Sequence, residues 1–206
     1  MKPFDYIKQY RKYFILGGII ILVLAGLLFI SYGYYPIAFV NHPHSSMGGM
    51  NGTFISARTF LKNYGVASVY YANFLKTYQP TASDAARLSS DDISRAVMDQ
   101  LVENVLIDQG AEKEVGGDLG VLVKEKVDQA SSDPELGKKA EALYGLSIGD
   151  FREKVLKPQA ERDILTGRLF LRGEKIDDWL ANAKQSSRVV FFSGRFHWNG
   201  TSVENR

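Results

Sequence analysis

The sequence contains no cysteine, which excludes disulfide bonds, thiolate metal ligands, a cysteine nucleophile and a lipoprotein-type anchor. It has only three histidines, and His42 and His44 stand in a loop-like stretch without a nearby carboxylate or thiol, far short of a metal ligand set. The phosphate-binding Gly-x-x-x-x-Gly-Lys, the nucleophile elbow Gly-x-Ser-x-Gly and the zinc motif His-Glu-x-x-His are absent. We therefore predict no metal, no cofactor and no catalytic residue.

Charge is missing from a long early stretch, because no Lys, Arg, Asp or Glu occurs between Lys12 and Arg58. Within it, Phe14–Tyr32 is almost wholly apolar, and a helix of this length at about 1.5 Å per residue would reach about 28 Å. This matches the hydrocarbon thickness of a bilayer, and tyrosines stand on both sides, as they do at membrane interfaces. The sequence predicts a transmembrane anchor over residues 13–35, in contact with lipid through Phe14–Tyr32.

Residues 1–12 form a basic tail with four Lys or Arg and one acid, a balance of +3 against +2 for the whole chain. By the positive-inside rule we expect this tail in the cytoplasm and the rest of a single-pass bacterial cell-membrane protein outside it. The alternative is a cleavable signal peptide, whose apolar core would be shorter and end at a small-x-small site. Because the tail accounts for the basic pI, no basic face remains to indicate nucleic-acid binding.

Residues 36–49 are rich in Pro, Ser and Gly toward their end and are interpreted as a linker. Residues 50–206 suffice for one domain with a modest core. We predict a mainly α fold, namely one transmembrane helix followed by a multi-helix extracytoplasmic domain. A small β element would be formed by the N- and C-terminal segments of that domain.

Several local signals place the elements of this domain. Thr53–Ile55 is short and β-prone, and Ser56 can cap an aromatic-rich helix. Ser89 and the acids after it begin the clearest helix, whose apolar residues recur every four positions and mark it as central. Pro158 should kink or split a later helix, and Val189–Phe192 is typical of a strand. No internal repeat is visible.

The ordered set of motifs resembles the N-terminal chaperone domain of the SurA, PrsA and PpiD group over Met50–Phe192. The residues that carry the resemblance are Asn51-Gly52-x-x-Ile55-Ser56 with Phe60, the helix Met98–Ala111, and Tyr144-Gly145-Leu146-Ser147-x-x-x-Phe151-Arg152. The resemblance implies a folding factor that holds unfolded or nascent secreted polypeptides without nucleotide. Many members also carry a parvulin-type prolyl isomerase domain, but only 14 residues follow Phe192. We therefore expect isomerase activity only if such a domain follows.

Aromatic side chains are the candidates for holding an apolar polypeptide segment, although each is equally typical of a core. The predicted substrate-binding residues are Phe60, Tyr64, Tyr70, Tyr71, Phe74 and Trp179. Two alternatives stay open: an adaptor or structural envelope protein that docks one partner, and the N-terminal part of a peptidyl-prolyl isomerase.

Overall fold

The structure is a computed structural model that describes residues 21–41, 52–78 and 88–206. The predicted basic tail over residues 1–12 lies outside the described residues. So do most of the predicted linker, both of its histidines, and Asn51 of the first motif.

The first described element is a helix over residues 21–31, which ends at a turn containing Gly33. No helix in the described part of the chain has both the length and the apolar character needed to cross a membrane. The described part of this helix reaches only about 16 Å, roughly half a bilayer's hydrocarbon thickness, and residues 13–20 of the predicted anchor lie outside the described residues. The predicted transmembrane helix, the signal anchor and the single-pass location in a bacterial cell membrane are therefore wrong on this finding.

The chain continues from Gly33 into a three-stranded antiparallel sheet of order β2-β1-β3. Its strands are β1 (Pro36–Asn41), β2 (Thr53–Ser56) and β3 (Arg188–Phe191). Strand β1 occupies the start of the predicted linker, which is thus part of the folded domain. Its alternating pattern explains why, since Ala38 and Val40 are fully buried while their neighbours are not. The predicted small β element exists, but the strands from the two ends of the predicted domain, β2 and β3, do not pair with each other, because β1 lies between them.

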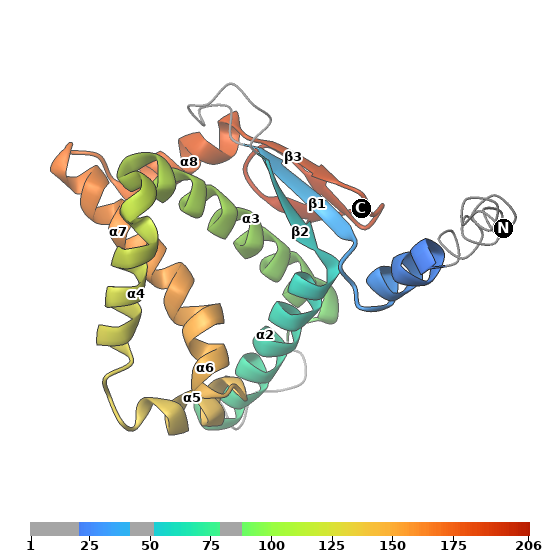
Figure 1. The fold of residues 1–206 in the computed structure, drawn as a ribbon, viewed down its shortest axis with the longest axis horizontal. Coiled ribbons are helices and arrows are strands. Elements are labelled where there is room, and N and C mark those ends of the chain that lie inside the picture. The colour runs from blue at the N-terminus through green and yellow to red at the C-terminus, as the bar shows by residue number, and fades with distance from the viewer. Residues whose placement is uncertain (1–20, 42–51, 79–87) are drawn as a thin grey trace, which may run out of the picture.

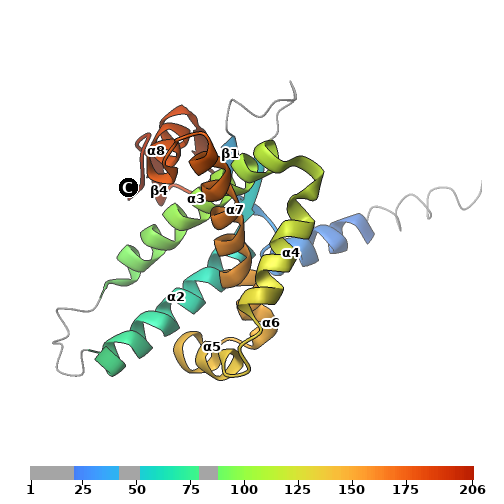
Figure 2. The same cartoon turned by 90° about the vertical axis from the view of Figure 1, so that its left-hand side faces the viewer.

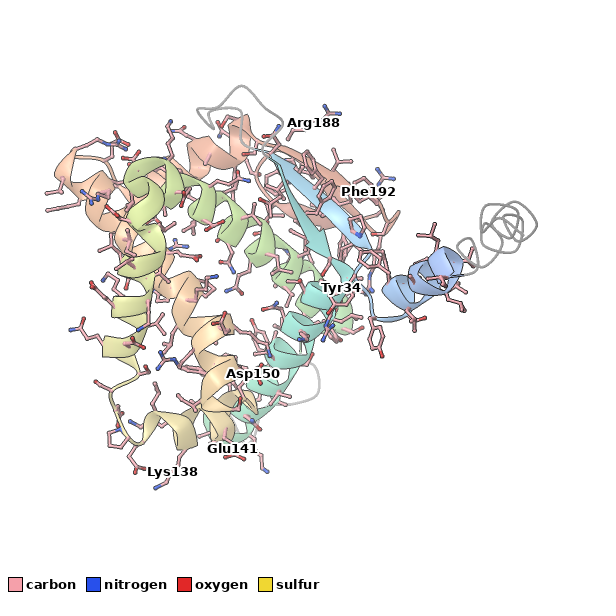
Figure 3. All side chains as sticks on the ribbon, viewed as in Figure 1. Tyr34, Lys138, Glu141, Asp150, Arg188 and Phe192 are labelled. Atoms are coloured by element: carbon pink, nitrogen blue, oxygen red, sulfur yellow. The ribbon has the colours of Figure 1, made fainter. Side chains whose placement is uncertain are left out.

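The two faces of this sheet differ. Val40 pairs with Thr53 on one side and with Val189 on the other, and together with Ala38 and Ile55 it faces the core. The opposite face carries Phe39, Phe54 and Phe192. The Phe54 ring lies tilted against Phe39, with centroids 4.9 Å apart, and stacks on Phe192 at 6.4 Å. Figure 3 labels Phe192 and Arg188 at this sheet. The sheet is therefore anchored by one apolar face and exposes aromatic rings on the other.

Two long helices follow strand β2 in the chain, and each begins directly after a serine that caps it. Helix α2 (Ala57–Tyr78) starts after Ser56, whose hydroxyl accepts from the Thr59 amide at 3.1 Å. Helix α3 (Ser90–Val115) starts after Ser89, which forms a reciprocal capping box with Asp92. These starts confirm the predicted caps.

The next elements follow α3 in the chain and end with the helices α7 and α8. They are η2 (Gly116–Asp118), α4 (Leu119–Ala130), α5 (Leu136–Tyr144), α6 (Ile148–Phe151), η3 (Arg152–Leu156), α7 (Lys157–Leu171) and α8 (Ile176–Ser186). Gly145 ends α5 in a left-handed conformation, as its position after Tyr144 predicts. The helix predicted to be kinked or split at Pro158 is interrupted close to it: the π-helical turn η3 ends at Leu156, and α7 begins at Lys157 with Pro158 in its first turn.

The last two strands, β4 (Phe196–Trp198) and β5 (Val203–Asn205), form a hairpin that packs on α3. Helix α3 is the centre of the fold, contacting α2, α4, α7, α8 and both sheets. Figure 1 shows it running diagonally between the sheet on one side and α4 and α7 on the other. In Figure 2, α7 lies beside α4, with α5 and α6 below them. This arrangement leaves α2, α3 and α7 as three walls that share one interior space.

Candidate functional site

A cavity of about 630 Å³ opens between α2, α3 and the η3–α7 segment, with Tyr144 of α5 at one end. We call it the central groove. Its walls carry aromatic rings, side-chain amides, aliphatic groups and charges in comparable measure. The lining residues used below are Tyr70, Tyr71, Ala96, Gln100, Asn104, Tyr144 and Arg162. The volume falls within the range of about 300–1,000 Å³ in which protein ligand sites are usually found.

One end of the central groove is closed by a ladder of rings. Tyr70 and Tyr144 stack with centroids 4.9 Å apart, Phe74 lies 6.0 Å from Tyr70, and Phe151 lies 5.2 Å from Tyr144. The Asn73 amide donates to the carbonyls of Ala142 and Leu143, which ties α2 to the end of α5. Burial, and next the neighbouring Tyr70, raise the pKa of Tyr144. The ladder therefore stays uncharged and presents π surfaces to the groove.

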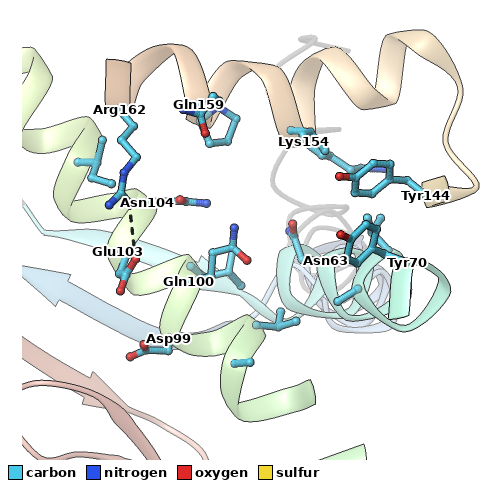
Figure 4. Close-up of a pocket in the computed structure, with 18 of the residues that line it drawn as sticks. Asn63, Tyr70, Asp99, Gln100, Glu103, Asn104, Tyr144, Lys154, Gln159 and Arg162 are labelled. Carbon is cyan, nitrogen blue, oxygen red and sulfur yellow. Dashed lines mark ion pairs between the residues drawn. The ribbon is translucent and has the colours of Figure 1, made fainter. Parts of the chain in front are cut away.

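The middle of the central groove is walled by amides. Asn63 comes from α2, Gln100 and Asn104 from α3, and Gln159 from α7. Figure 4 shows Gln100 and Asn104 on one wall and Gln159 on the facing wall, with Tyr70 and Tyr144 together at the far end. Within the described residues, the side chains of Gln100 and Asn104 have no hydrogen-bond partner. Each therefore offers an unused carbonyl and an unused amino group to a ligand.

Most charged residues of the groove are already paired in ways that hold the fold together. Glu103 lies 2.6 Å from Lys184 of α8 and 3.9 Å from Arg162 of α7, the pair dashed in Figure 4. Asp99 lies 3.5 Å from Lys184 and accepts from the Val203 amide at 3.0 Å. These acids join α8 and β5 to α3. Arg95, also on the groove wall, has no ion-pair partner among the described residues, so the groove keeps one unpaired positive charge.

The structure divides the predicted substrate-binding residues into two groups. Tyr70 and Tyr71 line the central groove, and Phe74 stacks behind Tyr70 at its end. Phe60 is buried in the main core against Phe196, and Tyr64 packs beside it. Three of the six predicted residues are thus brought together at the groove, and two of the remaining three belong to the main core.

The third, Trp179, also packs in the core, because α3 has a glycine where the indole lies. A Cβ added at Gly110 would come within 2.5 Å of the Trp179 ring and 3.1 Å of Leu165. The missing side chain lets the indole lie directly against the α3 backbone. Trp179 therefore holds α8 to α3 and does not line the groove.

The groove residues that sequence reasoning missed are Tyr144 and the amides. Ala96, Gln100 and Asn104 recur every four positions beside the apolar stripe of α3 and carry no charge, which is unusual for a helix face turned toward water. That neutral stripe is the signal that could have identified this wall. Tyr144 gave no comparable signal, because it stands at the end of a short polar helix.

No protein-family model, curated protein or solved structure matches this chain. The resemblance to the SurA, PrsA and PpiD chaperone domains therefore stays a prediction. The function has to be argued from the chemistry of the central groove.

Proposed function

We propose that this chain is a folding factor of the holding type, which takes extended segments of unfolded polypeptides into the central groove without nucleotide. The observation that carries the proposal is the pairing of unpartnered amides with a stacked aromatic end in one open cavity. This chemistry suits a polypeptide of any sequence, because it addresses the backbone and the apolar side chains separately.

The amides supply the backbone part of this recognition. A side-chain amide has one carbonyl acceptor and one amino donor group, the same pair of functions as a peptide unit. Gln100 and Asn104 stand one helical turn apart on α3 and face Gln159 of α7 across the groove. An extended segment between them can exchange hydrogen bonds with both walls without presenting a particular side chain.

The aromatic and aliphatic residues supply the apolar part. Tyr70 and Tyr144 present stacked rings, and Val66, Ala67 and Val155 add aliphatic surface beside them. Apolar side chains of an unfolded chain gain free energy by leaving water for such a surface. A folded protein keeps these side chains buried and would not enter the groove.

The test fills the central groove without removing any of its groups. Ala96 is exposed and lines the groove, so Ala96→Trp places an indole in the cavity, whereas Ala181→Trp places one on an exposed position of α8. The assay is suppression of light scattering by an aggregating, chemically unfolded substrate protein. We expect the wild type and Ala181→Trp to suppress aggregation and Ala96→Trp to lose most of that activity. Failure of the wild type to suppress aggregation at several-fold excess, or full activity of Ala96→Trp, would refute the proposal.

A second function, an adaptor that docks one folded partner, is favoured by the aromatic outer face of the sheet. Phe54 and Phe192 are each more than half exposed there. A photo-crosslinking residue at position 100 in the groove and one at position 192 on the sheet separate the two functions. Holding predicts many crosslinked chains at position 100, and an adaptor predicts one stoichiometric partner at position 192.

A further inference from the structure

A second cavity, of about 410 Å³, lies between α3, α4 and the η3–α7 segment. We call it the acid cavity, because four carboxylic side chains line it: Asp108, Glu112, Glu153 and Glu161. The wall from α4 is mainly apolar: Leu119, Val123 and Val127 are buried, and Lys124 is its one charged residue. The cavity thus combines a hydrocarbon surface with a group of carboxyls.

Glu161 is the unusual member of this group. Its side chain belongs to a residue only 7% exposed, and in the described part of the chain it has no hydrogen-bond or ion-pair partner. Burial first, and then the charge of Asp108, raise its pKa to about 7. Burial also raises the pKa of Asp108. A carboxyl in so buried a residue is costly to ionise without a partner, and the charge of Lys157 offsets this cost only in part.

The basic residues around the acid cavity do not balance its four acids. Arg152 contacts Asp128 and donates to the Ser131 hydroxyl at 2.6 Å, and Lys124 lies 2.6 Å from the same Asp128. These two cations exceed the charge of Asp128 by one, so with the exposed Lys157 two positive charges remain against the four acids. The cavity therefore has an excess of negative charge that its own cations do not neutralise.

We infer that the acid cavity binds an organic cation, an alkylammonium or alkylguanidinium group, with its charge against Glu161 and Asp108 and its hydrocarbon part along the α4 wall. Carboxylates form their strongest hydrogen bonds with such cations, and the apolar wall suits the methylene stem. In the described residues, no three His, Cys, Asp or Glu side chains gather closely enough to hold a metal ion, which favours an organic cation. The cation is either a free amine or a Lys or Arg side chain of a polypeptide.

Calorimetric titration of the full chain with n-butylammonium chloride tests this inference, with n-butanol as the uncharged probe of the same shape. We expect saturable binding of the cation and none of the alcohol. Glu161→Gln and Asp108→Asn should each weaken binding at least tenfold, and Glu125→Gln, which changes an exposed acid of α4, should leave it within twofold. Affinity should rise between about pH 6 and pH 8, since Glu161 becomes charged near pH 7.

Two capped peptides, identical except for Lys or norleucine at one position, distinguish the sources of the cation. Tighter binding of the Lys peptide than of butylammonium, lost in Glu161→Gln, assigns the site to a polypeptide side chain. Binding of butylammonium alone assigns it to a free amine. The inference is overturned if butylammonium does not saturate, if butanol binds equally well, or if neither carboxyl variant weakens binding.

Discussion

The central groove and the acid cavity share one stripe of helix α3, and they differ in its chemistry. Ala96, Gln100 and Asn104 line the groove, and Asp108 and Glu112, at the next two turns, line the acid cavity. The amides are neutral and need no counter-ion in a half-open space. The carboxyls are brought toward a buried Glu161, where charge is costly.

The comparison shows that the spacing of side chains along α3 and the chemical type of those side chains have separate effects in this fold. The four-residue spacing on α3 determines which side chains face an interior space, and it is the same in both regions. Residue type and burial then decide what each space can hold: varied polypeptide segments in the groove, a cation in the cavity. Helix α7 closes both, because Pro158 and Gln159 face the groove and Lys157 and Glu161 face the cavity.

The largest expected effect comes from breaking this shared wall. Leu165 is fully buried on α7 beside Gly110, whereas Leu171 of the same helix is 78% exposed. Leu165→Ala should lower the free energy of unfolding by about 3 kcal/mol, and Leu171→Ala by less than about 0.5 kcal/mol. Urea denaturation measures both. Because both regions depend on the packing of α7 on α3, loss of less than about 1 kcal/mol at Leu165 would contradict the common scaffold.

A smaller effect sharpens the electrostatic side of the comparison. The folded state raises the pKa of Glu161 from 4.5 to about 7, so it binds that proton more tightly than the unfolded chain does. The contribution of Glu161 to the free energy of unfolding therefore falls as pH rises from about 4.5 to about 7, by about 3 kcal/mol at most, and is then level. Glu161→Gln removes this penalty and should be more stable than the wild type at pH 8 but not at pH 4.5.

Thermal unfolding of the wild type, Glu161→Gln and Glu125→Gln across this pH range separates Glu161 from the other titrating groups. Asp92, Asp128, Asp133 and Asp150 have lowered pKa values and act in the opposite direction in all three proteins. Their contribution cancels in the difference between variants. Equal profiles for Glu161→Gln and the wild type would show that Glu161 carries no penalty.

Local signals in the sequence predicted the helices well because their causes are local. Ser56 and Ser89 cap the helices they were expected to cap. Strand β1 was missed because the apolar run before it was interpreted as a membrane anchor and because one of its two partners, β3, lies far along the chain. That interpretation used the hydropathy and length of the whole run Phe14–Tyr32, whereas the described helix covers residues 21–31.

The sites were harder to predict than the elements. Aromatic content alone does not separate a groove from a core, because the same ring suits both. Tyr70 and Phe60 both belong to α2, but Tyr70 lines the groove and Phe60 lies in the core. The difference depends on which element of the fold packs against each ring. The acid cavity was invisible for the same reason, since Asp108 and Glu161 are far apart in sequence and meet only when α7 packs beside α3 and α4.

The smallest expected effect is confined to the groove. The Asn73 amide donates to the Ala142 and Leu143 carbonyls at 2.9 and 3.1 Å and holds α5, with Tyr144, against α2. Asn73→Ala should cost about 1 kcal/mol, since two carbonyls at a helix end lose a donor but remain reachable by water. Asn182→Ala, an exposed asparagine of α8, is the matched control.

This substitution separates the two regions because only one of them contains the Tyr70–Tyr144 stack. Asn73→Ala frees Tyr144 to move away from Tyr70, so aggregation suppression should fall several-fold. Butylammonium binding at Glu161 should stay within twofold, since α5 contributes no wall to the acid cavity. If both activities fell together in Asn73→Ala while its urea midpoint stayed near that of Asn182→Ala, the two regions would be one coupled site.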